Sequence, residues 1–214
     1  MSRHDTEQDQ LETIKAWWDK YGTGLLSVIL VIVLSFSGYR YWQGYTYNKA
    51  VEASSVFEVL DMSLATGVFG EVSREARRLM QDQPKSPYSG SAALMLADFH
   101  WQAGEIDEAI DALSWLVNSK QSADLKQIAQ LRLARIYIQQ ADFVAAQQQL
   151  DLLHSQRLAP AVTANVDYVA GLLALAQKQT AQAYEMFKRV VENEQAQSDL
   201  RNLASIQMDD LAIE

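Results

Sequence analysis

The sequence contains no cysteine, which excludes disulfide bonds, thiolate nucleophiles and cysteine-based metal sites. The absence fits an oxidising compartment but does not demonstrate one. Only three prolines and nine glycines occur among the 214 residues, whereas alanine, leucine and glutamine are abundant. This composition is typical of a helical protein.

Positive charge is also scarce, because 18 lysines and arginines stand against 27 acidic residues and give a net charge of −9. The one small basic cluster is formed by Arg74, Arg77 and Arg78. A basic face of the kind that binds nucleic acid is therefore not expected, and the sequence predicts no nucleic-acid partner.

Catalytic motifs are lacking as well. None of the three histidines, His4, His100 and His154, has a partner at metal-ligand spacing, and the sequence has no phosphate-binding glycine loop or nucleophile elbow. We interpret His100 as a contact within a helical hairpin and His154 as a residue at a helix end, where a basic side chain suits the helix dipole. The acidic residues around Glu105 and Glu108 are expected to begin a helix and to be solvated. The sequence thus predicts a non-enzymatic protein that needs no cofactor or metal.

A single long apolar run, residues 21–39, is free of charge, and no second run of this length exists. As a helix it would measure roughly 28 Å, close to the hydrocarbon thickness of a bilayer. Aromatic side chains suited to the lipid headgroup region flank it on both sides. The predicted membrane-interface residues are Trp17, Trp18, Tyr21, Tyr39, Tyr41 and Trp42.

The alternatives for this run are a cleavable signal peptide and a buried core helix. Ser35 and Ser37 resemble a cleavage site, but the first 20 residues are acidic, whereas a signal peptide begins with a positive segment. We therefore expect an uncleaved membrane anchor. Three basic residues precede the run and two follow it closely, which favours an inside location for the short tail by a narrow margin.

The remaining chain contains three repeats. Ala109, Ala146 and Ala183 follow one another at intervals of 37 residues, and each is preceded by a large–small pair such as Leu96-Ala97. This pattern resembles the tetratricopeptide repeat, in which small residues lie where the two helices of a hairpin cross, although the usual period is 34 residues. The predicted fold is all-α: one transmembrane helix, then a tetratricopeptide-repeat-like α-solenoid with a C-terminal capping helix. The predicted segments are a tail at 1–20, the span at 21–39, and a repeat domain at 40–214 that comprises a degenerate hairpin at 46–83, repeats near 90–123, 127–160 and 164–197, and a cap at 199–212.

The first helix of each hairpin lines the concave surface of such an array, and this register predicts an apolar groove. Exposed apolar surfaces usually bind partners. The terminal helix could also fill the groove with Leu200, Leu203, Ala204, Ile206 and Leu211, since solenoid ends need a cap. Both can hold if that helix covers only the C-terminal end. The candidate partner-binding residues are Leu94, Asp98, Trp101, Leu131, Arg135, Ile138, Tyr168, Leu172 and Leu175.

Several of these features together resemble the YfgM family of Gram-negative bacteria over the whole chain. They are the acidic tail that ends in Trp17, Trp18 and Lys20, the single span, the Gly-Tyr-Arg-Tyr-Trp segment at 38–42 and the divergent repeats. The resemblance implies an ancillary subunit of the Sec translocon (SecYEG) in the inner membrane, with a cytoplasmic tail and periplasmic repeats. It also implies partnership with the membrane-anchored periplasmic prolyl isomerase PpiD, contact with membrane lipid, and transfer of exported client proteins to periplasmic chaperones.

Two functional classes follow. The first is a scaffold or chaperone-like adaptor at the translocon. The second is an envelope-stress signalling regulator that acts through the tail, with the repeats as its sensor. Removal of residues 1–20 separates them, because an adaptor would keep its periplasmic partners and a regulator would lose its output.

Overall fold

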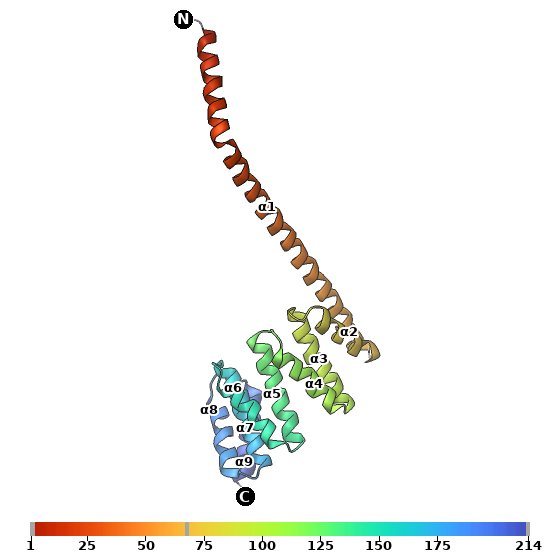
Figure 1. The fold of residues 1–214 in the computed structure, drawn as a ribbon. Helices are drawn as coiled ribbons and strands as arrows, with labels where there is room; N and C mark the ends of the chain where they lie inside the picture. The colour runs from red at the N-terminus through yellow and green to blue at the C-terminus, as the bar shows by residue number, and fades with distance from the viewer. Residues whose placement is uncertain (1–2, 67–68, 213–214) are drawn as a thin grey trace. The chain divides into compact units, whose positions relative to one another are not determined.

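The computed structural model describes residues 3–66 and 69–212, and every regular element within these ranges is an α-helix (Figure 1). The chain divides into two compact units, residues 1–52 and 53–214.

The first unit belongs to one long helix, α1 (Arg3–Thr66), which continues into the second unit. The helix has no break between the predicted span and residues 46–66. Within the described residues, α1 is the one helix long and apolar enough to cross a membrane. Its most apolar window has a mean hydropathy of 1.9 and is 6% buried.

The second unit is a series of helical hairpins. The helices α3 and α4, α5 and α6, and α7 and α8 pack as sequential pairs, and α9 packs against α8 and α7. The predicted all-α solenoid with a C-terminal capping helix is confirmed. Its helices are α2 (Phe69–Asp82), α3 (Pro87–Ala103), α4 (Ile106–Asn118), α5 (Ala123–Gln139), α6 (Phe143–His154), α7 (Pro160–Ala176), α8 (Thr180–Glu192) and α9 (Ser198–Ala212).

Proline marks the start of two of the three repeats. Ser86 is the N-cap of α3 with Pro87 at its first position, and Pro160 begins α7 in the same way. The boundaries predicted near residues 90, 127 and 164 fall inside α3, α5 and α7, because the motif residues that define the repeat lie one turn into each first helix.

The three repeats use the same turn between their two helices. Gly104, Ala141 and Lys178 all have positive φ, at 79°, 57° and 62°. The residue after each of them donates its backbone N–H to the carbonyl five residues earlier, at 2.8–2.9 Å. Glycine adopts this left-handed conformation without steric cost, whereas for other residues it costs roughly 1–2 kcal/mol. The second and third turns are therefore strained where the first is not.

Replacing Ala141 with glycine should therefore stabilise the protein. The left-handed backbone would lose its steric cost, partly offset by the extra entropy of glycine in the unfolded chain. We expect the free energy of unfolding to rise by about 0.5–1 kcal/mol, measured by denaturation of the full chain in detergent. The reverse change, Gly104→Ala, should lower it by a similar amount, and a gain in stability from that control would contradict this account.

The repeat alanines are packing residues, as the register predicts. Ala109, Ala146 and Ala183 are each the fourth residue of their helix and are each fully buried. They belong to three successive apolar clusters that run through the unit. A side chain larger than a methyl group has no space at these helix crossings.

One expectation about the capping helix is wrong. Leu200 and Ala204 of α9 are buried, but Leu203 and Ile206 are 50% and 55% exposed. Only one face of α9 contacts α7 and α8, and these two side chains lie on the other.

Candidate functional site

The candidate site is the surface formed by the first helices of the repeats. Helix α5 contacts α3 on one side and α7 on the other, and α7 also contacts α9. The nine predicted residues lie on α3, α5 and α7. The structure divides them into an open part around α5 and a covered part on α7.

The first open pocket lies between α3 and α5 and has a volume of about 300 Å³. Three predicted residues, Asp98, Trp101 and Arg135, line it. The carboxylate of Asp98 accepts a hydrogen bond from Nε2 of Gln102 at 2.8 Å. Trp101 is half-buried and supplies an apolar wall, while its inner edge packs against the first core cluster.

A second pocket, of about 330 Å³, lies between α5 and α7. Leu131 and Arg135 line it together with Ile128, which is 41% exposed. Because Arg135 lines both pockets, they meet over α5. We call the two pockets together the α5 groove.

Two of the predicted residues on α3 and α5 line neither pocket of the groove. Leu94 packs against the first core cluster, and Ile138 against the cluster of α5, α6 and α7. Both are half-buried. Their packing role follows from their positions on the sides of α3 and α5 that face a neighbouring helix.

The predicted residues on α7 are partly covered by the capping helix. Tyr168, Leu172 and Leu175 are half-buried and pack in one cluster with Met208 and Leu211 of α9. The ring of Tyr168 also lies against Phe187, with centroids 5.5 Å apart. The C-terminal part of the predicted surface is thus occupied by the chain itself.

Sequence reasoning missed Arg132, which lines both pockets beside Arg135. Its Nη1 donates to the backbone carbonyl of Leu94 on α3 at 3.2 Å, which holds its guanidinium at the groove. The signal was available, since Arg132 lies three residues before Arg135 and is therefore its neighbour on the helix surface. Ile128 was missed for the same reason.

His100 is a buried hairpin contact, as predicted, and is 4% exposed. Its Nδ1 pairs with the carboxylate of Glu105 in the following turn, and its Nε2 lies 3.4 Å from Nη2 of Arg77 on α2. The imidazole thereby links α2, α3 and the turn before α4. In the part of the chain that the structure describes, no group of three or more histidine or acidic side chains could hold a metal ion.

Asp167 is a buried acid on α7, 7% exposed, at the repeat position where α5 carries Gln130. Burial raises the pKa of its carboxyl group, and the charges of Arg189 and His154 oppose this shift only in part. A raised pKa means that the folded state prefers protonated Asp167. The contribution of Asp167 to the free energy of unfolding is therefore complete below the ordinary aspartate pKa. It is lost as the pH rises through the raised pKa of the folded state.

Asp167→Asn should accordingly stabilise the protein at neutral pH, because the amide is isosteric and uncharged. We expect the melting temperature of the variant to exceed that of the unmodified chain at pH 7. The difference should shrink as the pH falls toward the ordinary aspartate pKa of about 3.9. Melting curves of both proteins between pH 4 and pH 8 test this, and a difference that grows in acid would contradict it.

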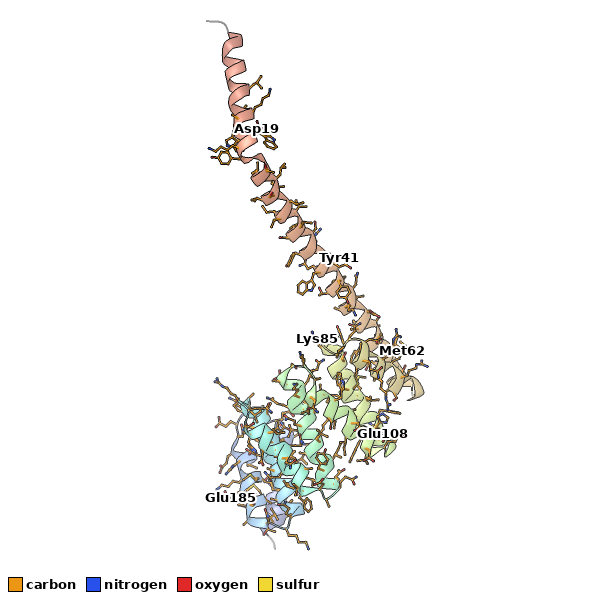
Figure 2. The ribbon with its side chains drawn as sticks, viewed as in Figure 1. Asp19, Tyr41, Met62, Lys85, Glu108 and Glu185 are labelled. Carbon is orange, nitrogen blue, oxygen red and sulfur yellow. The ribbon has the colours of Figure 1, made fainter. Side chains whose placement is uncertain are left out.

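The predicted membrane-interface residues are all exposed on α1. Trp17, Trp18 and Tyr21 are about half exposed, and the residues at the other end of the span are more so, up to 78% for Tyr41. Figure 2 labels Tyr41 on α1. About 24 residues of helix separate Trp17 from Tyr41, a rise of roughly 36 Å, so the two aromatic groups are spaced to reach opposite headgroup regions.

Comparisons with known proteins agree with this architecture. The family model of the tetratricopeptide repeat-like domain matches residues 15–213. A protein of Neisseria gonorrhoeae named ancillary SecYEG translocon subunit is 24% identical over 99% of this chain and 100% of its own length. Proteins with the same name match from Escherichia coli, at 26% identity over 73% of this chain and 75% of theirs, and from Aggregatibacter actinomycetemcomitans, at 23% over 87% and 89%. The resemblance to the YfgM family is confirmed.

Proposed function

Because the chain belongs to the tetratricopeptide repeat-like domain family, we propose that it is a membrane-anchored ancillary subunit of the SecYEG translocon that acts as a protein scaffold. The observation that carries the proposal is the extent of the match to the Neisseria protein, which covers 99% of this chain and so includes both the apolar helix and the repeats. A likeness limited to the repeats would support only a general binding module.

The membrane anchor is α1, whose exposed apolar side chains and flanking aromatics suit a bilayer. We propose that the tail lies in the cytoplasm and the repeats in the periplasm of a Gram-negative cell, with the helix in the inner membrane. The excess of basic residues before the span supports this orientation. Protease added to spheroplasts should digest the repeats, and their protection until the cells are lysed would reverse the orientation.

The repeats supply the interaction surface in this proposal. The α5 groove is open and lined by Trp101, Leu131 and Arg135, and buried aromatic and arginine side chains are common hot spots of protein interfaces. We propose PpiD and exported client proteins as further partners, on the strength of the family resemblance. The name that the relatives carry supports the translocon role and gives no support to the signalling regulator considered as an alternative.

Affinity purification tests the proposal directly. The tagged full chain, extracted from membranes in mild detergent, should bring SecYEG with it, identified by mass spectrometry against an unrelated single-span protein as a control. Deletion of residues 1–20 should leave this association intact, since a scaffold does not depend on the tail. Recovery of SecYEG no better than in the control would overturn the translocon role.

A further inference from the structure

Neither guanidinium group in the α5 groove has an acidic partner among the residues that the structure describes. No carboxylate of a described residue forms an ion pair with Arg132 or Arg135, whereas Arg74 and Arg78 on α2 are paired with Glu75 and Asp82. Two acids also line the groove, Asp98 in the first pocket and Asp124 in the second, but neither forms an ion pair with the arginines, and Asp98 accepts a hydrogen bond from Gln102. Arg132 and Arg135, which form no ion pair with a described residue, can therefore pair with an acidic side chain of a partner, and Arg135 is the more available because Arg132 already donates to Leu94.

The arginines lie where the two pockets meet, with apolar side chains on either side. Trp101 lies in the pocket toward α3, and Ile128 and Leu131 lie in the pocket toward α7. A ligand that fills both pockets must therefore cross α5 and pass over Arg135. A polypeptide that ended at Arg135 would fill only one of the two pockets. A segment from the interior of a polypeptide can fill both.

The width of the groove sets the spacing within that polypeptide. Neighbouring helices are about 8–10 Å apart, and the two pockets are also displaced along α5, because its residues 132–139 line the first and 124–135 the second, so their centres are separated by about 13 Å. In an extended chain, side chains at positions i, i+2 and i+4 face the same way at intervals of about 6.6 Å. The matching pattern is an apolar residue, an acidic residue two positions later and an apolar residue two positions after that.

We propose that the α5 groove binds an extended internal segment of a partner protein in which an aspartate or glutamate lies between two apolar residues at alternate positions. The acidic side chain pairs with Arg135, with Arg132 beside it, and the apolar side chains enter the pockets on either side. Arginine suits this role because its planar guanidinium can form two hydrogen bonds to one carboxylate. The inference rests on the proposed function, since it specifies the chemistry of the partner that the repeats bind.

The probes are two fluorescein-labelled peptides that share the core Leu-Ser-X-Ser-Leu between glycine spacers, with glutamate or glutamine at X. Binding to the full chain in detergent micelles is measured by fluorescence anisotropy, with empty micelles as the blank. The glutamate peptide should bind about 10-fold more tightly than the glutamine peptide, because a charge-assisted hydrogen bond distinguishes them. Added salt should reduce the difference.

Three variants show whether this preference depends on the groove. Arg135→Gln should bind both peptides equally, and Arg135→Glu should prefer a third peptide with lysine at X. Arg78→Gln, which changes the net charge by the same amount on α2, should keep the preference for glutamate. Arg135 is exposed, so these variants should melt at the same temperature as the unmodified chain.

Equal affinity of the unmodified chain for the glutamate and glutamine peptides, or a preference that survives in Arg135→Gln, would overturn the inference. Either result leaves the translocon role standing as long as SecYEG still co-purifies. Absence of SecYEG from the purification would overturn the proposed function and leave the peptide preference as a property of the groove alone.

Discussion

Replacing Gly171 with alanine is expected to lower the free energy of unfolding by about 1–3 kcal/mol, through overpacking. The sign is opposite to that of helix propensity, since alanine is favoured over glycine inside a helix by roughly 0.5–1 kcal/mol. The reason is Phe187, which faces Gly171 from α8. A Cβ at position 171 would lie 2.6–2.9 Å from three carbon atoms of its ring. Phe187 is fully buried and lies against Tyr168, so the ring has little room to move.

The other two repeats show the compensating change. At the positions equivalent to Gly171 and Phe187, the first repeat has Ala97 and Leu113, and both are buried in the same cluster. The second repeat has Ala134 and Leu150, which are also buried together. The third repeat thus carries a larger residue on its second helix and a smaller one on its first.

The double variant Gly171→Ala/Phe187→Leu should therefore be more stable than the sum of the two single changes predicts. We expect a coupling energy of about 0.5–3 kcal/mol, obtained from denaturation of the four proteins of the cycle. Gly90→Ala is the comparison on α3, where the added Cβ would meet the ends of the Leu125 and Gln121 side chains instead of a buried ring and should cost less stability. Purely additive effects of the two changes would show that the small residue at 171 does not compensate for the large residue at 187.

The sequence predicted the repeats well because their signals are local. The alanines at intervals of 37 residues and the prolines at the starts of α3 and α7 depend only on close helix crossings and on capping, both of which recur in each copy. The continuity of α1 was predictable for a similar reason, since no proline interrupts residues 21–66.

The candidate site was less predictable because it depends on which neighbour covers each helix face. The 37-residue register gives α5 and α7 equivalent positions, but α9 packs against α7 and α8 and not against α5, so Leu172 is covered while the α5 groove stays open. The motif residues are the same in a terminal repeat and in an internal one, so the repeat pattern does not show which repeat the capping helix covers. The exposure of Leu203 was misjudged similarly, because an apolar residue in a capping helix was assumed to face inward.

The strained turns at Ala141 and Lys178 were also beyond the sequence. Gly104 indicates a left-handed residue in the first repeat, but alanine and lysine rarely adopt a positive φ, so Ala141 and Lys178 do not predict one. The alignment of the repeats places these residues together, and the structure shows that they share a conformation as well as a position.

The difference between the covered and open parts of the surface leads to the second large effect. Leu172→Asp should strongly destabilise the protein, by about 3 kcal/mol or more, because it places a charge among Met208, Leu211 and the other apolar side chains under α9. Ile128→Asp makes the same kind of change in the α5 groove, where the side chain is 41% exposed, and should alter stability by less than about 0.5 kcal/mol.

The two variants should also differ in how they lose binding to a partner. Ile128→Asp should weaken recovery of a partner protein while its melting temperature stays unchanged, whereas any loss of binding by Leu172→Asp should accompany unfolding. A charged substitution of Trp101 should also weaken binding, but it is a less clean probe because Trp101 packs partly against the first core cluster. Melting temperature and pull-down yield are measured on each full-length variant in the same detergent. A stable, binding-deficient Leu172→Asp together with an unfolded Ile128→Asp would place the open part of the groove at α7 instead of α5.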